Sequence, residues 1–280
     1  MATTDDAPGE PERSGTIATR DPIVDEGGLQ VDDVTVTFGG IVALDHARLH
    51  ARTGDITGLI GPNGAGKTTL FNCLTGIYAA NSGTISWQGR DLLGEPPYRV
   101  ADHGIARTFQ NLALFPNLTV RENVIVGLHR VRRSNWVSSA LRLPSVMSES
   151  KEVRAVADGA LEEVGLSQVA SKPAAGLPYG TLKRVELARA IAAEPGLLLL
   201  DEPAAGLAHG EVDELMELIR QLRDRRDLTI VLVEHHMGLV MRLCDRVTVL
   251  NLGATIAEGE PEEVGNDPTV IEAYLGGNEE

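Results

Sequence analysis

The sequence of 280 residues has few cysteines. Two occur, Cys73 and Cys244, and each stands in an apolar stretch with no second cysteine and no cluster of histidines nearby. This pattern supports neither a disulfide framework nor a zinc site, and it fits the reducing environment of the cytosol. A chain of this length buries enough surface on folding to be stable without such cross-links.

Long apolar segments are also lacking. The longest run without a charged residue covers 22 residues, Thr68 to Gly89, and threonine, asparagine, serine, glutamine and glycine interrupt it. Such a run is too polar to cross a membrane as a helix. The sequence also starts without a basic segment followed by an apolar stretch. We therefore expect any association with a membrane to be peripheral, on its cytoplasmic side.

Basic residues are scarce at both ends of the chain. The formal net charge is −15, of which residues 1–28 contribute −5 and residues 258–280 contribute −8. The remainder is nearly neutral, so it has no basic excess with which to displace counterions from a nucleic acid. Residues 1–28 are rich in Pro, Gly, Asp and Glu, and they contain too few apolar residues to offset the entropy cost of ordering. We expect a disordered N-terminal tail and no nucleic-acid partner.

The body of the chain alternates between strand-like and helical segments. Strand patterns cover residues 29–38, 55–60, 197–200 and 228–233. Apolar residues at helical spacing run from Asn117 to about Ser171, with an interruption near Pro144, and a second helical stretch runs from Glu211 to Arg226. Buried strands that alternate with helices are typical of a parallel sheet. The pattern predicts an α/β fold with a helical insertion.

A phosphate-binding loop follows the strand over residues 55–60. Gly61-Pro-Asn-Gly-Ala-Gly-Lys67-Thr68 matches the pattern G-x-x-x-x-G-K-[ST], between a strand and a helix. Its glycines let backbone N–H groups turn toward phosphate oxygens at the N-terminus of the helix. We expect Lys67 to reach the β- and γ-phosphates of a nucleotide, and the Thr68 hydroxyl to ligate Mg²⁺.

Two carboxylates end a buried strand further along the chain. Leu197–Leu200 are followed by Asp201 and Glu202, at the end of the strand where open α/β sheets bind their ligands. Asp201 is expected to hold Mg²⁺, mostly through water. Glu202 is expected to act as the general base that polarises the attacking water. An acidic pair that only caps the next helix is the alternative, which the upstream phosphate loop disfavours.

In these motifs the chain resembles the ATP-binding cassette (ABC) ATPases, and further elements of that family occur in order between residues 29 and 257. The resemblance implies that Gln110 contacts Mg²⁺ and the attacking water, that His235 hydrogen-bonds the γ-phosphate, and that Phe38 stacks on adenine. The nucleotide-binding residues are then expected to be Phe38, Gly61, Pro62, Asn63, Gly64, Ala65, Gly66, Lys67, Thr68, Thr69 and Gly180.

A second group of motifs implies a dimer. Leu177–Arg184, which contains Gly180, resembles the signature segment that closes over the γ-phosphate bound by the opposite subunit. Ala204–Ala208 lies at the position of the loop that crosses the dimer. The residues that depart from the family's usual motifs are Pro178, Tyr179 and Leu182 in the signature segment and His236 after the switch histidine.

The resemblance also implies a domain organisation. We expect a P-loop ABC cassette over residues 29–257, with a mostly parallel core sheet and an antiparallel N-terminal β portion. A helical subdomain is expected to be inserted at about residues 112–175. An acidic helical tail is expected over residues 258–280.

The end of the chain resembles one particular group of ABC ATPases. The segment Glu258 to Gly277 resembles the ending of ATPases from branched-chain amino acid importers, and so does Asp201-Glu-Pro-Ala-Ala-Gly-Leu207. Phe38-Gly-Gly and the long helical insertion resemble the first of the two ATPase subunits of such importers. The resemblance implies an ATP-hydrolysing subunit that binds two transmembrane permeases and a second ATPase, identical or related. The full system would include an extracytoplasmic solute-binding protein.

Three other classes within the same superfamily are alternatives. The ATPase of a lipopolysaccharide exporter has a similar cassette but is expected to lack the Glu-Ala-Tyr-Leu-Gly-Gly ending. The mechanical ATPases of DNA maintenance carry long heptad-bearing arms, whereas the 113 residues from Lys67 to Gly180 contain no sustained heptads. Translation factors generally carry two cassettes, and this chain carries one.

Overall fold

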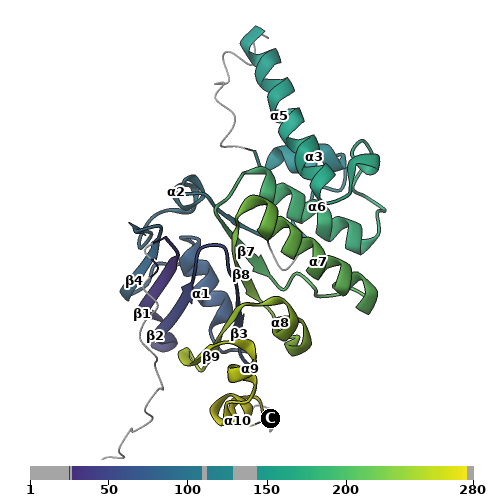
Figure 1. The fold of residues 1–280 in the computed structure, drawn as a ribbon. Coiled ribbons are helices and arrows are strands. Elements are labelled where there is room, and N and C mark those ends of the chain that lie inside the picture. The colour runs from purple at the N-terminus through teal and green to yellow at the C-terminus, as the bar shows by residue number, and fades with distance from the viewer. Residues whose placement is uncertain (1–24, 26, 109–111, 129–143, 276–280) are drawn as a thin grey trace, which may run out of the picture.

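The structure is a computed structural model that describes residue 25 and residues 27–108, 112–128 and 144–275. This part of the chain forms two sheets and the helices around them (Figure 1). The smaller sheet has four antiparallel strands in the order β2-β1-β4-β5. Its strands are β1 (Leu29–Phe38), β2 (Ile41–Ala51), β4 (Ser82–Trp87) and β5 (Arg90–Asp91). Burial follows the two-residue period of a strand with one face on the core, as at Leu29 and Val31.

The larger sheet has six strands in the order β10-β9-β3-β8-β7-β6. They are β3 (Ile56–Ile60), β6 (Ile105–Arg107), β7 (Leu197–Asp201), β8 (Thr229–Val233), β9 (Arg246–Asn251) and β10 (Ala254–Gly259). All neighbours are parallel except β9 and β10, which form an antiparallel hairpin at the edge. Every residue of β3, β7 and β8 is buried, as expected for parallel strands covered on both faces. The predicted α/β class, with a mostly parallel core sheet and an antiparallel N-terminal portion, is confirmed.

Helices fill the space on both sides of this sheet. The helices are α1 (Lys67–Leu74), α2 (Pro97–Asp102), α3 (Val120–Val126), α5 (Pro144–Glu163), α6 (Tyr179–Ala192), α7 (His209–Arg226), α8 (Met237–Leu243), α9 (Pro261–Gly265) and α10 (Pro268–Leu275), with a 3₁₀ turn at Ser167–Val169. One core joins α1 to both sheets, through residues such as Phe71 and Leu199. A second core lies between the other face of the large sheet and helices that include α6 and α7.

In the described part of the chain, every element between β6 and β7 is a helix or a 3₁₀ turn. Figure 1 shows α3, α5 and α6 grouped at the end of the molecule that is opposite α10. Thr119 begins α3 with a capping box, because its hydroxyl accepts the N–H of Glu122 while the Glu122 carboxylate accepts the N–H of Thr119. Pro144, near which an interruption of the helical pattern was expected, begins α5, a position where proline is tolerated. These helices agree with the expected insertion.

The two ends of the chain differ in detail from the expected boundaries. Asp25 belongs to the expected tail, yet its carboxylate accepts the N–H groups of Gly27 and Thr53 at 3.0 and 2.9 Å. These bonds lower the pKa of Asp25. Residues 1–24 of the predicted N-terminal tail lie outside the described residues. At the other end, β10 belongs to the large sheet up to Gly259 and the first tail helix begins at Pro261.

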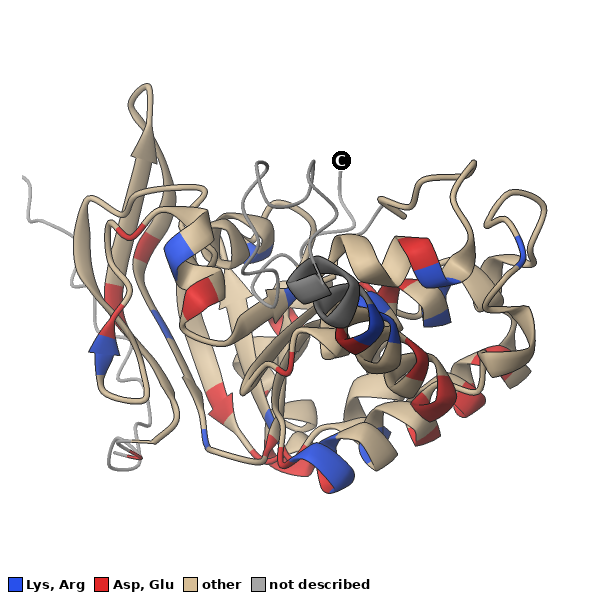
Figure 2. Cartoon of the chain, turned by 90° about the horizontal axis from the view of Figure 1, so that it is seen from above, with Lys and Arg blue, Asp and Glu red and all other residues tan. Residues whose placement is uncertain are grey.

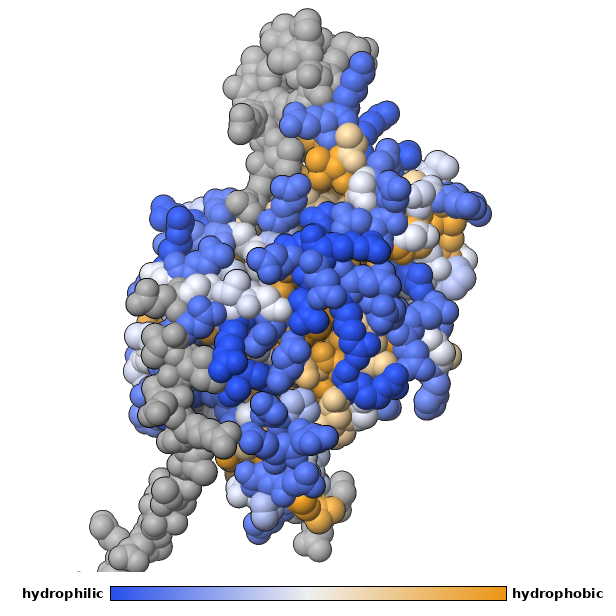
Figure 3. All heavy atoms as spheres, viewed as in Figure 1, coloured by the Kyte–Doolittle hydropathy of each residue, from blue (hydrophilic) through white to orange (hydrophobic). Residues whose placement is uncertain are grey.

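Charged residues of both signs are intermixed over the helical part of the molecule, as Figure 2 shows. The face drawn in Figure 3 is mostly hydrophilic, with small apolar areas between polar ones. No helix in the described part of the chain is long and apolar enough to cross a membrane. The distribution of charge agrees with the nearly neutral body expected from the sequence.

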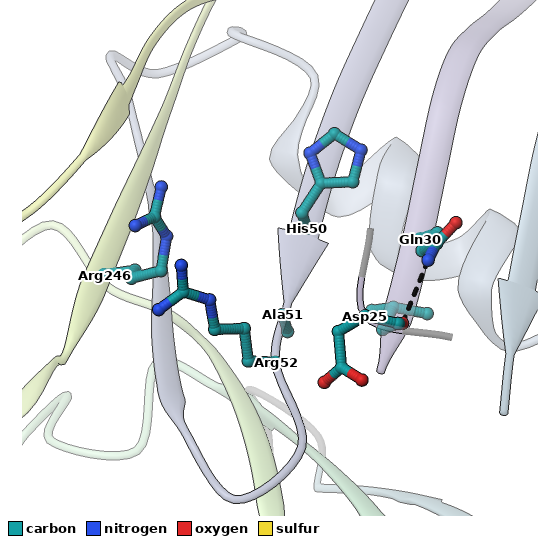
Figure 4. Close-up of a pocket in the computed structure, with 7 residues that line it drawn as sticks. Asp25, Gln30, His50, Ala51, Arg52 and Arg246 are labelled. Atoms are coloured by element: carbon teal, nitrogen blue, oxygen red, sulfur yellow. Dashed lines mark hydrogen bonds between the residues drawn. The ribbon is translucent and has the colours of Figure 1, made fainter. Parts of the chain in front are cut away.

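His50 links the two sheets. Its Nε2 lies 3.0 Å from Oδ1 of Asp32 on β1, and its Nδ1 lies 3.2 Å from Oε2 of Glu258 on β10. The hydrogen bond to Glu258 raises the pKa of His50, burial opposes this shift, and Asp32 adds to it. Figure 4 shows the surroundings of this junction, with His50 between Arg52 and Arg246 on one side and Gln30 and Asp25 on the other, where Gln30 donates to the backbone carbonyl of Asp25. Glu258 and Asp32 therefore stabilise the protonated form of the His50 imidazole.

The junction predicts a pH dependence of stability. Because folding raises the pKa of His50 above its ordinary value of 6.5, the stabilisation is fully present below that pH and is lost as pH rises through the raised pKa. We expect thermal unfolding to show a component of about 1 kcal/mol, or about 2–4 °C in Tm, that disappears in this window. His50→Gln should lack this component, whereas His209→Gln, on the exposed start of α7, should retain it. An unchanged pH profile of Tm in His50→Gln would contradict the assignment.

Candidate nucleotide site

The loop Gly61–Gly66 connects β3 to α1 and can form only with glycine at key positions. Gly61 has φ +147°, and a Cβ there would lie 2.1 Å from the carbonyl oxygen of Leu250. Gly66 has φ +102°, and a Cβ there would lie 2.8 Å from the carbonyl oxygen of Ala43. Gly64, at φ +78°, faces open space. The backbone therefore folds back on itself between two fixed contacts and leaves its outer side accessible.

Lys67 folds back into this loop. Its Nζ donates to the carbonyl oxygens of Gly61 and Pro62 at 2.7 and 2.8 Å. Burial lowers the pKa of Lys67, and the negative charge of Glu202 opposes this shift. No side chain caps the start of α1 at Gly66, so the positive end of the helix is open to an anion. A cation and a helix N-terminus thus converge on one cradle, which fits phosphate oxygens.

Asp201 ends β7 in a buried ion pair. Its Oδ2 accepts from Nη2 of Arg107 at 2.8 Å, and both side chains are 8% exposed. Arg107 ends β6, and its Nη1 donates to Oδ1 of Asn72 at 2.8 Å. Its guanidinium carbon lies 5.5 Å from the centre of the Phe71 ring. Arg107 therefore fixes Asp201 against α1, the helix that begins with the phosphate loop.

Glu202 and His235 follow neighbouring strands. Asp201 pairs with Val233 across β7 and β8, so the residues after each strand lie side by side. Oε1 of Glu202 is 3.8 Å from Nδ1 of His235. The side chain of Glu202 is 22% exposed and that of His235 is 61% exposed, so both are accessible to solvent. The structure brings together the two residues expected to act on the attacking water and on the γ-phosphate.

Phe38 is accessible and does not belong to the core. It is 44% exposed at the end of β1, and its ring lies edge-to-face against Tyr78, with ring centres 5.0 Å apart. Tyr78 follows α1 and is 39% exposed. Two exposed aromatic rings therefore lie near the end of the phosphate-loop helix, where a flat apolar base can stack on them.

The signature segment lies against the expected dimer-crossing segment of the same chain. Tyr179 begins α6, and a Cβ on Gly206 would lie 3.1 Å from its ring. A Cβ on Gly180 would lie 2.6 Å from Oε1 of Glu211 at the start of α7. The ring of Tyr179 thus occupies the space beside Gly206, which gives the departure from the family's usual signature a packing role.

Some site residues were not identified from the sequence, and one expected residue lies outside the structure. Gln110 is not among the described residues, so its expected contact with Mg²⁺ stays a prediction. Arg107 and Tyr78 were missed, although Arg107 stands only three residues before Gln110. His236 is exposed and directly precedes α8.

Comparison with known proteins identifies the family of this chain. A family described as "ABC transporter" matches residues 44–205. The chain belongs to the ABC transporter family. A second family, described as "Branched-chain amino acid ATP-binding cassette transporter", matches residues 254–280. The chain is therefore an ABC ATPase, an enzyme whose ATP hydrolysis is coupled to transport.

Several relatives of this ABC ATPase cover nearly the whole chain. It is 42% identical to the high-affinity branched-chain amino acid transport ATP-binding protein BraF of Pseudomonas aeruginosa and 44% identical to LivG of Escherichia coli. Each comparison covers 89% of this chain and 97% of the relative. Among solved structures, the ADP conformation of MJ1267, an ATP-binding cassette of an ABC transporter, has a TM-score of 0.78 at 32% identity, over 89% of this chain and 98% of that one. The cassette fold expected from the sequence is confirmed.

The buried ion pair predicts a large stability effect at Arg107. Arg107→Met leaves the Asp201 carboxylate buried without its cationic partner, which costs about 3–5 kcal/mol and lowers Tm by about 6–20 °C. Adding Asp201→Asn removes the unpaired charge, so the double variant should recover part of this loss. Thermal unfolding of the two single variants and the double variant measures the coupling. Additive losses in this cycle would show that the pair does not stabilise the fold.

Proposed function

We propose that this ABC ATPase is the energy-coupling subunit of an importer for branched-chain amino acids or a related small solute. The observation that carries the ATPase assignment is the Glu202–His235 pair, 3.8 Å apart, at the same sheet edge as the phosphate loop. The solute class is supported by the names of the relatives and by the family matched at residues 254–280. The same match favours an importer over the ATPase of a lipopolysaccharide exporter.

The residues present fit Mg²⁺ and ATP. The cradle of Gly61–Thr69 with Lys67 is expected to take the phosphates, and Phe38 with Tyr78 the adenine. Thr68 and Gln110, with Asp201 through water, are expected to hold Mg²⁺. When bound, the metal neutralises negative charge that develops on the transferred phosphoryl group. Thr68 is exposed at the first turn of α1, and Asp201 presents its carboxylate beside the same helix.

Glu202 is proposed to accept a proton from the attacking water. As the water oxygen bonds to the γ-phosphorus, the bond from that phosphorus to the bridging oxygen breaks and ADP leaves with the electron pair. His235 donates a hydrogen bond to a γ-phosphate oxygen, and Lys67 stabilises the charge on the β- and γ-phosphates. The 3.8 Å separation of Glu202 and His235 lets the two side chains act on neighbouring atoms of one reacting group.

The proposed complex contains more than this chain. Two transmembrane permeases are expected to bind it from the membrane, with the chain peripheral on the cytoplasmic side. A second ATPase, related or identical, is expected to supply the signature segment that completes the site at Lys67. Gly180 would in turn serve the nucleotide of that second ATPase. An extracytoplasmic binding protein is expected to deliver the solute.

The proposed roles of Glu202 and Lys67 predict different kinetic effects. Glu202→Gln keeps the size of the side chain but cannot take the proton, so kcat in the assembled transporter should fall by about 100-fold or more. Its Kd for ATP should stay within about twofold. Lys67→Ala removes charge-assisted phosphate contacts and should raise that Kd by about tenfold or more. Equal ATP affinity in Lys67→Ala, or kcat within about twofold in Glu202→Gln, would contradict these roles.

The importer assignment is tested by reconstituting the chain with its permeases and the second ATPase in liposomes. We expect binding protein loaded with a branched-chain amino acid to stimulate ATP hydrolysis, and the empty binding protein not to do so. Gly180→Asp should abolish this stimulation by placing a carboxylate beside Glu211, while the ATP affinity of this chain stays within about twofold. Full stimulation without a second, distinct ATPase would favour a symmetric pair, and no stimulation by any branched-chain amino acid would overturn the solute class.

A further inference from the structure

Glu234 is a buried carboxylate that the site described above does not use. It follows β8 directly, precedes His235, and is 1% exposed. Its Oε1 accepts the N–H of Ala204 at 3.0 Å. Burial raises the pKa of Glu234, whereas the backbone N–H groups of Ala204, His235 and His236 lower it. The carboxylate therefore lies between the backbone after β7 and the backbone after β8.

The turn that Glu234 holds contains a strained residue. Glu202 has φ +46°, a left-handed conformation that costs about 1–2 kcal/mol for a residue with a side chain. Such a conformation persists only where the surrounding structure fixes it. The N–H of Glu202 donates to the carbonyl of Val233 at 3.0 Å, and Nζ of Lys183 lies 3.5 Å from the carbonyl oxygen of Glu202. The bond from Ala204 to Glu234 fixes the turn two residues further on.

We propose that Glu234 is a positioning residue that ties the segment beginning at Ala204 to the turn carrying His235, and thereby sets the distance between Glu202 and His235. This inference rests on the proposed roles of Glu202 and His235. A displacement of Ala204–Ala208 would be transmitted to His235 through the side chain of Glu234. This side chain belongs to the turn after β8 and is bonded to the turn after β7 at Ala204. The phosphate cradle at Lys67 belongs to another loop, so Glu234 affects hydrolysis and leaves ATP binding unchanged.

The test uses the full chain in the assembled transporter. Glu234→Ala removes the bond to Ala204 and should lower kcat by about tenfold or more, because small displacements of reacting groups have effects of this size. Its Kd for ATP should stay within about twofold. Glu234→Gln retains a carbonyl oxygen that accepts the N–H of Ala204, so it should keep kcat within about threefold of the wild type. Rescue by glutamine separates the hydrogen bond from the volume of the side chain.

A matched control separates positioning from stability. Asn123 is a fully buried polar residue of α3 whose Nδ2 donates to the carbonyls of Phe115 and Thr119. Asn123→Ala should lower Tm, as Glu234→Ala does, with kcat within about twofold of the wild type. Should Glu234→Ala not fold, Glu234→Thr, whose shorter side chain withdraws the acceptor from Ala204, takes its place with the same expected loss of kcat.

Three outcomes would overturn the proposal. They are kcat within about twofold of the wild type in the Ala or Thr variant, an equal loss of kcat in Asn123→Ala, and a raised Kd for ATP that accounts for the whole effect. Failure of the proposed function looks different, because Glu202→Gln would then retain hydrolysis whatever the Glu234 variants do. Measuring all variants in one preparation of the transporter keeps these results separate.

Discussion

The register of three parallel strands is the constraint on which the rest of the site depends. Val233 of β8 pairs with Leu59 of β3 on one side and with Asp201 of β7 on the other. One row of residues across the sheet therefore fixes where each strand ends. The phosphate loop follows β3, Glu202 follows β7 and His235 follows β8, so the cradle, the carboxylate and the imidazole meet at one edge. A shift of β8 by one residue would exchange the side chains on its two buried faces and displace His235 from Glu202 and the phosphate loop.

A buried carboxylate stands at the end of β7 and directly after β8, and each is bonded to a polar group of another segment. Asp201 and Glu234 are both almost inaccessible to solvent, and an isolated carboxylate in such a place is costly. Arg107 balances the charge of Asp201, and the backbone N–H of Ala204 binds Glu234. Each of these contacts joins segments far apart in the sequence, such as β6 to β7. The bonds that stabilise the two buried carboxylates therefore also fix the positions of the segments that follow β6, β7 and β8. The rigidity of this edge of the large sheet is thus a consequence of burying charge there.

Local patterns predicted the fold and much of the site. Consecutive residues form the glycine-rich loop, each buried strand and the pair Asp201–Glu202, so the sequence alone was enough to find them. Strand β1 has the bounds that its alternation predicts. Arg107, Tyr78 and Glu234 were missed because their partners come from distant segments: Arg107 bonds to a residue 94 positions away and Glu234 to one 30 positions away. The helical pattern was expected to be interrupted near Pro144, and α5 begins at that residue.

Helix α6 gives the helical insertion a direct connection to the catalytic edge. Tyr179 at its start packs beside Gly206, and Lys183, one turn later, reaches the carbonyl of Glu202 from a buried position. In the proposed complex the start of this helix faces a second ATPase, while α3 and α5 pack against its length. A movement of the insertion would thus shift Tyr179 and Lys183 together, since both lie on α6 and Nζ of Lys183 is 5.8 Å from the centre of the Tyr179 ring. Since Glu202 already occupies a strained backbone conformation, a small displacement of these two supports is enough to alter its orientation toward His235.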